Sequence, residues 1–274
     1  MSNKSSKNKE FVVTFDADAI IQAILGSKTP IDTTMSKKER LTYYAYIRIM
    51  AELGWPAYND GDVDFHERIV ELVENERFDE LEASIYDHYD AVYIKDLQEL
   101  LEDIPLINKE RLPVLKEAFM LYNLGYYYGS VTLLISQIVG IVKDIAAELW
   151  GKGMEFDDDH LRLLNTRYDL DIKEDNLKKH KLNEKAKALL ALLEGHKYND
   201  EEREYLYLIG YFRCKLFCDK LNDEDILHHA NRNMIFHGEQ ISFGSKEQAL
   251  KLILCVDALC CVAYVIHEEL ISEE

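Results

Sequence analysis

The distribution of proline limits how this chain can fold. All four prolines lie at or before Pro113, so the remaining 161 of the 274 residues contain none. Only 12 glycines occur in the whole chain. Sheet-rich folds need frequent turns, and turns draw on glycine and proline, so this composition favours long helices. Because 47% of the residues are hydrophobic, the chain can bury a sizeable core. We therefore expect an all-α fold.

Apolar residues recur at helical spacing along most of the sequence. One helix is expected from Ser36 to Gly54, and two or three amphipathic helices are expected within 64–103. Residues 11–25 are compatible with either a strand or a short helix. Two prolines flank a boundary near residue 105. We expect an acidic N-terminal helical region of unknown role (1–105) and a helical bundle (106–274).

The C-terminal part contains the clearest helix boundaries. One helix is expected to begin near Asp223 and to end at Gly238, a residue type that commonly ends helices. Ser245 and Gln248 form a capping pair for a last helix running to about Leu270. This last helix is apolar nearly all round, so other elements must cover it on most sides.

Charge is distributed unevenly along the chain. The formal net charge is −19, which excludes a uniformly basic nucleic-acid-binding surface. Residues 51–100 contribute −12 of it, with 15 acidic and 3 basic side chains. A local basic site can still act separately, because salt screens distant charges over about 8–10 Å. The most basic stretch is 173–187, where Lys178, Lys179 and Lys181 are candidates for contacting RNA phosphates. Acidic residues are interspersed there, so a solvated helix face is the alternative interpretation.

Cysteine usage and hydropathy predict a soluble cytoplasmic protein. The five cysteines are an odd number in apolar surroundings, which favours buried thiols over a disulfide framework. Asp16 and Asp18 interrupt the first apolar run, so the N-terminus is a poor signal peptide. The longest apolar stretch, 252–266, contains Asp257 and is shorter than the roughly 20 residues needed to cross a bilayer. We expect no membrane association.

Two patterns resemble metal sites only in part. Acidic residues between Asp60 and Glu71 fall at ligand positions of a calcium loop, but Phe65 occupies the position where such loops need glycine. Cys214 and Cys218 are one helical turn apart and have no partner pair at zinc-finger spacing. We expect neither a metal nor a cofactor.

The segment 231–239 carries the residues with the most distinctive chemistry. Arg232 supplies a permanent planar charge suited to phosphate oxygens. His237 can transfer protons near neutral pH, and the amide of Asn233 could orient its imidazole. Arg232 and His237 are five residues apart, about 140° around an ideal helix. They converge only if the helix unwinds near Phe236 or if a second subunit completes the site. The alternative is that both side chains simply cap carbonyls at a helix end.

Two further histidines precede this segment. His228 lies one turn before Arg232, and His229 lies one turn before Asn233. Either could extend the polar site, and the alternative is a pair of exposed or core-edge histidines.

This segment resembles the R-x(4–6)-H motif of the HEPN superfamily, because Arg-Asn-x-x-x-His is followed by Gly238 and a capped apolar helix. Residues 111–149 resemble the first helix pair of abortive-infection-type members. The resemblance covers roughly 108–270 and does not extend into 1–105. The chain departs from the pattern at Val139, where many relatives have glutamate.

The resemblance implies a helical bundle that dimerises with its two motifs facing each other. It also implies a metal-independent RNA endonuclease, a toxin or phage-defence effector, that uses the substrate's 2′-hydroxyl as nucleophile. Arg232 would stabilise charge on the transition state, and His237 would act as general base or acid. The alternatives are a non-catalytic interaction module whose acidic face, 51–100, binds a basic protein regulator, and an accessory subunit of a toxin–antitoxin or defence complex.

Overall fold

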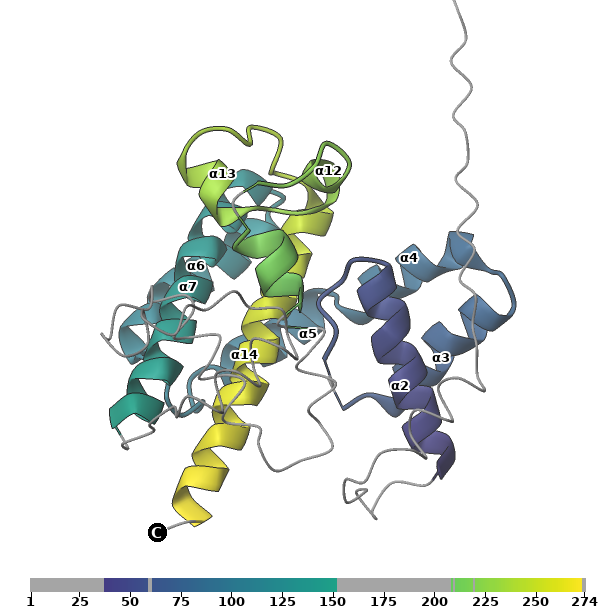
Figure 1. The fold of residues 1–274 in the computed structure, drawn as a ribbon, viewed down its shortest axis with the longest axis horizontal. Helices are drawn as coiled ribbons and strands as arrows, with labels where there is room; N and C mark the ends of the chain where they lie inside the picture. Colours follow the sequence, from purple (N-terminus) through teal and green to yellow (C-terminus); the bar gives the residue numbers. More distant parts are fainter. Residues whose placement is uncertain (1–36, 59–60, 152–207, 209, 219, 273–274) are drawn as a thin grey trace, which may run out of the picture.

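The computed structural model describes residues 37–58, 61–151, 208, 210–218 and 220–272. Within these ranges the regular elements are helices and none is a strand, which confirms the predicted all-α fold (Figure 1). Residues 11–25, for which a strand or a helix was expected, lie outside the described ranges.

Four helices lie in the described residues of the N-terminal part, 37–58 and 61–105. They are α2 (Lys37–Glu52), α3 (Val63–Glu74), α4 (Phe78–His88) and α5 (Ala91–Leu100). α2 packs against α3, and α3 packs against α4. Aspartates fix two helix starts, because Asp62 accepts from the backbone N–H of Phe65 and Asp90 accepts from that of Val92. The expectation of helices within 36–54 and 64–103 is therefore confirmed.

In the described residues of the C-terminal part, α6 (Leu112–Asn123), α7 (Tyr127–Gly151) and α14 (Lys246–Ser272) pack together. α6 and α7 form a helical hairpin, and α14 packs against both. The connection between α6 and α7 turns at Gly125, whose φ of +77° is a conformation that favours glycine. Gly129, four residues farther on, lies inside α7.

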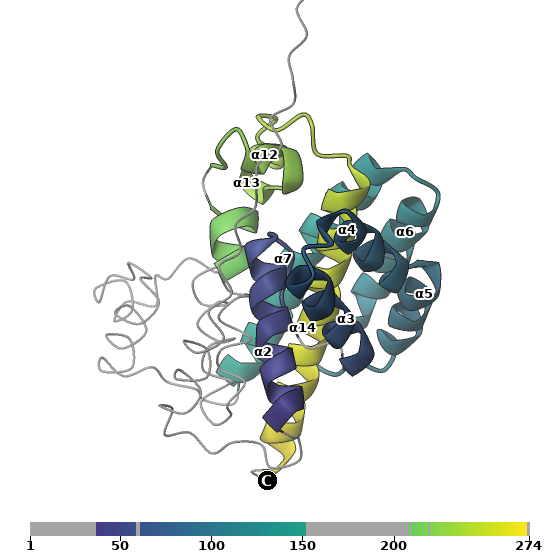
Figure 2. The ribbon, with the colours of Figure 1, turned by 90° about the vertical axis from the view of Figure 1, so that its right-hand side faces the viewer.

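α14 lies in the middle of the molecule, with α2, α3 and α4 on one side and α6 and α7 on the other (Figure 1). α5 lies beside α6 (Figure 2). Its start has the predicted capping pair. The Ser245 N–H donates to Gln248 Oε1 at 3.2 Å, and the Gln248 N–H donates to Ser245 Oγ at 3.1 Å. Residues 249–260 are buried without interruption, which confirms that other elements cover this apolar helix.

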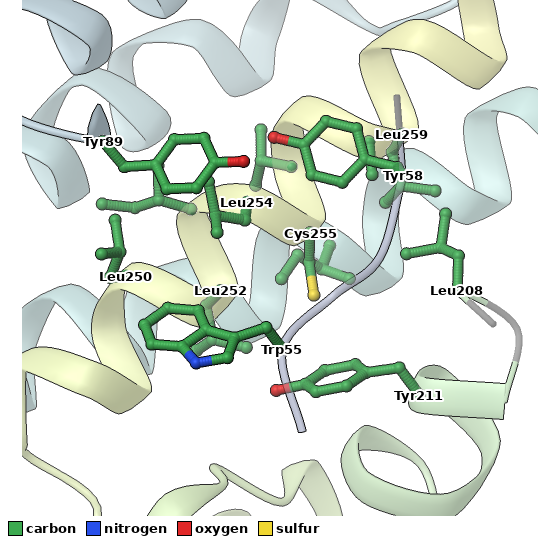
Figure 3. Close-up of a cluster of buried hydrophobic side chains, with 14 of the residues drawn as sticks. Trp55, Tyr58, Tyr89, Leu208, Tyr211, Leu250, Leu252, Leu254, Cys255 and Leu259 are labelled. Atoms are coloured by element: carbon green, nitrogen blue, oxygen red, sulfur yellow. The ribbon is translucent and has the colours of Figure 1, made fainter. Parts of the chain in front are cut away.

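The hydrophobic core continues across the predicted boundary near residue 105. Trp55, Tyr58 and Tyr89 lie against Leu254 and neighbouring residues of α14 in one cluster (Figure 3). The N-terminal region therefore packs directly on the last helix.

A buried polar contact joins the same two regions. Asp257, only 6% exposed, accepts hydrogen bonds from the hydroxyls of Tyr58, at 2.6 Å, and Tyr93. The charge that interrupts the apolar stretch of α14 is thus satisfied by two tyrosines from the N-terminal part.

Helix α7 contains Tyr127–Ile145, a stretch of the described chain that is long and apolar enough to span a membrane. Half of this stretch is buried inside the protein. Core helices of globular proteins share that length and composition.

The helix predicted from Asp223 to Gly238 is wrong as a single element. The structure has two short helices, α12 (Asp225–His228) and α13 (Arg232–Phe236). Between them His229 and Asn231 have extended backbone, with ψ values of 142° and 123°. The helix is interrupted because Asn231 starts a new one, its side chain accepting from the backbone N–H of Met234 at 2.9 Å.

Candidate active site around Arg232 and His237

The candidate site lies at the end of the bundle where α14 begins, with α12 and α13 beside each other (Figures 1 and 2). α13 packs against α7. It ends as predicted, because Gly238 follows the helix with φ of +75°.

Asn231 anchors the start of α13. Its side chain is fully buried, and its Nδ2 donates to the carbonyls of Lys215 and Cys218, both at 3.0 Å. Its backbone N–H donates to Gln240 Oε1 at 2.9 Å. Sequence reasoning assigned no role to Asn231, although asparagine is a preferred N-cap residue.

Arg232 is held in a defined orientation. Its Nη1 donates to Asn233 Oδ1 at 3.0 Å, and its guanidinium carbon lies 5.5 Å from the centroid of the Phe236 ring. Its Nε is buried without a hydrogen-bond partner, one of two such side-chain atoms in the described residues. Buried donors are normally paired, so this nitrogen is an unsatisfied group within the candidate site.

Asn233 orients the arginine. Its amide oxygen accepts from Arg232, and its amide nitrogen donates to the Cys218 carbonyl at 3.1 Å. These hydrogen bonds tie Asn233 to the arginine and to the chain before α12, and its orientation of the His237 imidazole stays a prediction.

His237 is exposed at the C-terminal end of α13. Its backbone N–H donates to the Asn233 carbonyl at 3.0 Å, so helical hydrogen bonding persists up to His237. Unwinding near Phe236, one of the two conditions for convergence, is therefore absent, and an ideal helix places the two Cβ positions about 140° apart. The Arg232 guanidinium lies over the ring of Phe236, the residue directly before His237.

A second polar cluster lies at the same end of the bundle. His228 Nδ1 is 3.0 Å from Glu247 Oε2, and the other Glu247 oxygen accepts from Lys251 Nζ at 2.7 Å. The side chain of His228 is 56% exposed, whereas that of Lys251 is 1% exposed. The two predicted histidines therefore differ, since His229 is buried.

Burial determines the protonation of His229. Loss of water around the ring, reinforced by the positive charges of Lys251 and Lys215, lowers the pKa of His229 to about 2. Its Nδ1 lies 3.4 Å from the Tyr211 hydroxyl. His229 is therefore a neutral core residue at physiological pH and not a proton donor for a substrate.

Other predicted site residues fall elsewhere. Lys178, Lys179 and Lys181 lie outside the described residues. In the described part of the chain no three histidine, cysteine or acidic side chains are grouped to hold a metal ion.

The cysteines that the structure describes are all free thiols. Burial raises the pKa of Cys255 and of Cys260, which keeps both thiols protonated, as expected of buried core cysteines. Cys214, in contrast, is exposed.

Comparisons of the chain with protein-family models, with curated proteins and with solved structures find no match. Functional assignment therefore depends on the residues and geometry of the site and on the motif that they form.

Proposed function

We propose that this protein is a metal-independent RNA endonuclease of the HEPN type, acting in the cytoplasm as a toxin or phage-defence effector. The observation that carries the proposal is the placement of the Arg232 guanidinium. Asn233 and Phe236 hold it over the residue that precedes His237, whose side chain is exposed. A fixed cation and a group that transfers protons are the minimum needed to cleave a phosphodiester.

The chemistry follows from the properties of the two side chains. Arg232 binds the non-bridging oxygens of the scissile phosphate with its free N–H groups and stabilises the charge that builds up in the transition state. His237 removes the proton from the adjacent 2′-hydroxyl, whose oxygen attacks phosphorus. The products are a 2′,3′-cyclic phosphate and a 5′-hydroxyl.

A second copy of the chain would complete this site. Because the Arg232 and His237 backbone positions point about 140° apart, each motif in one chain presents an incomplete surface. A homodimer with the two motifs facing each other would bring the cation of one chain and the imidazole of the other to one RNA strand.

The alternative function is an interaction module. Acidic side chains on α3, α4 and α5 are exposed in excess over basic ones, for example Glu71, Glu74, Asp87 and Asp96. This surface would suit a basic protein regulator. Toxicity on expression that is unchanged by His237→Ala would favour this alternative.

Incubation of purified protein with labelled RNA in excess EDTA tests the proposed function. Cleavage should persist in EDTA, and Arg232→Ala and His237→Ala should each reduce its rate by about 10²–10⁴-fold. Arg232→Lys should cleave RNA almost as slowly as Arg232→Ala, because a lysine cannot make the planar paired contacts of an arginine. The control is Arg68→Ala, which removes an exposed arginine on α3 and should leave the rate unchanged.

Cleavage that survives in the Arg232→Ala, His237→Ala double variant would refute the assignment. Circular dichroism of each variant excludes unfolding as the cause of a lost activity.

A further inference from the structure

Cleavage by a 2′-hydroxyl requires two proton transfers, one from the attacking oxygen and one to the departing 5′-oxygen. The Arg232–His237 motif supplies one imidazole per chain. The inference below rests on the proposed function and concerns the group that performs the second transfer.

His228 has the local geometry of an oriented acid. Its Nδ1 lies 3.0 Å from Glu247 Oε2. Because an ionised carboxylate can only accept a hydrogen bond, the ring proton on this side belongs to Nδ1. The other nitrogen, Nε2, is then the one offered to a ligand, on a side chain that is 56% exposed. A carboxylate in this position both orients an imidazole and stabilises its protonated form.

Glu247 is itself held in place by a buried cation. Its Oε1 accepts from Lys251 Nζ at 2.7 Å. Lys251 Nζ also donates to the His228 carbonyl at 3.3 Å and lies 5.0 Å from the centroid of the Trp55 ring. The pair with Lys251 fixes the position of Glu247 on the first turn of α14. Lysine, carboxylate and imidazole thus form a chain that runs from the core to the surface.

Two buried glutamines fix the backbone that carries His228 and Arg232. Gln240 Nε2 donates to the carbonyls of Ile226 and His229, at 3.0 and 2.7 Å. Gln248 Nε2 contacts the same two carbonyls, at 3.2 and 3.3 Å. The segment that links α12 to α13 is therefore held from both sides, so that neither functional side chain depends on a loose loop.

The order along the chain suits an in-line displacement. Arg232 lies between His228 and His237, four residues from one and five from the other. Four extended residues span at most about 14 Å, and the five residues from Arg232 to His237 rise about 7.5 Å along a helix. The length of chain thus limits how far the backbone of either imidazole can lie from that of the cation that binds the phosphate.

We propose that His228 is the general acid of the cleavage reaction and that Glu247 is its positioning residue. His237 takes the 2′-hydroxyl proton while the O2′–P bond forms. The P–O5′ bond breaks, its electron pair goes to O5′, and the protonated His228 gives its Nε2 proton to that oxygen. His228 ends neutral and His237 ends protonated, and exchange with water restores both.

A change of leaving group tests this role. The probes are uridylyl-(3′,5′)-adenosine, whose 5′-oxygen must be protonated as it departs, and uridine 3′-(4-nitrophenyl phosphate), whose nitrophenolate departs without a proton. His228→Ala should slow cleavage of the dinucleotide by about 10²–10⁴-fold and cleavage of the nitrophenyl ester by less than about 10-fold. Glu247→Gln should also slow cleavage of the dinucleotide more than cleavage of the nitrophenyl ester, but both rates should decrease less than in His228→Ala. Arg232→Ala should slow both reactions.

His267→Ala is the matched control, because it removes a half-buried histidine farther along α14 and should leave both rates unchanged. If His228→Ala slows cleavage of both probes equally, or of neither, His228 is not the general acid. Neither result would contradict the proposed nuclease function. Wild-type protein that cleaves neither RNA nor the nitrophenyl ester would overturn the proposed function.

Discussion

Acidification should destabilise this protein through one buried histidine. His229 is 4% exposed, and burial together with the charge of Lys251 lowers its pKa to about 2. In the unfolded chain the same imidazole titrates near 6.5. Between these two values the unfolded state binds a proton that the folded state does not bind. The free energy of unfolding therefore falls as the pH drops below about 6.5.

The magnitude follows from this difference in proton binding. For each pH unit below 6.5, the free energy of unfolding falls by about 1.4 kcal/mol, until the pH reaches the pKa of His229 in the folded state. At pH 5 the loss from His229 alone is about 2 kcal/mol, a large part of the 5–15 kcal/mol that stabilises typical domains.

Urea unfolding at pH 7 and pH 5 measures this contribution. His229→Gln removes the titrating ring and keeps a polar group near Tyr211. This variant will be less stable than wild type at pH 7, but its free energy of unfolding should fall by about 2 kcal/mol less between the two pH values. Parallel losses in the two proteins would refute the assignment of a buried neutral imidazole.

Three substitutions test packing elsewhere. Asp257→Asn removes the charge that accepts two tyrosine hydroxyls and should lower the free energy of unfolding by about 1.5–3 kcal/mol in urea titrations. Gly140→Ala should cost about 1–3 kcal/mol in the same assay, because a Cβ there would lie 2.0 Å from Arg111 Nη1. Asn231→Ala removes a helix cap and two further buried hydrogen bonds, so it should cost about 2–4 kcal/mol and should also slow RNA cleavage.

Local patterns made much of the fold predictable. The scarcity of glycine and proline indicated helices, and the Ser245–Gln248 pair marked the start of the last helix, where the structure has it. Gly238 marked the end of a helix, and its positive φ in the structure is a conformation that favours glycine. These features depend only on residues near in sequence.

The parts that were not predictable depend on contacts between distant residues. Asn231 interrupts the expected helix because its amide finds the carbonyls of Lys215 and Cys218. The difference in exposure between His228 and His229 likewise arises from tertiary structure. Tyr211 and Lys251 lie near the ring of His229, whereas the side chain of His228 is largely exposed to solvent. The spacing of residues in the sequence does not predict which of these two histidines is buried.

The candidate site was predictable in composition and only partly in geometry. Arg232 and His237 were singled out by residue type and spacing. The role of Asn233 was not predictable, because its amide has several possible partners and the structure pairs it with Arg232. Glu247 was missed, since 19 residues separate it from His228 in the sequence.

The chemical ends of the cleaved RNA test the central claim most directly. Mass spectrometry of fragments formed in EDTA should find 2′,3′-cyclic phosphate, or the 3′-phosphate from its hydrolysis, on one fragment and 5′-hydroxyl on the other. A substrate with a single 2′-deoxyribose at the cleavage position should remain intact there. Fragments that carry 3′-hydroxyl and 5′-phosphate, or cleavage at the deoxyribose, would contradict a mechanism in which Arg232 and His237 activate the RNA's own hydroxyl.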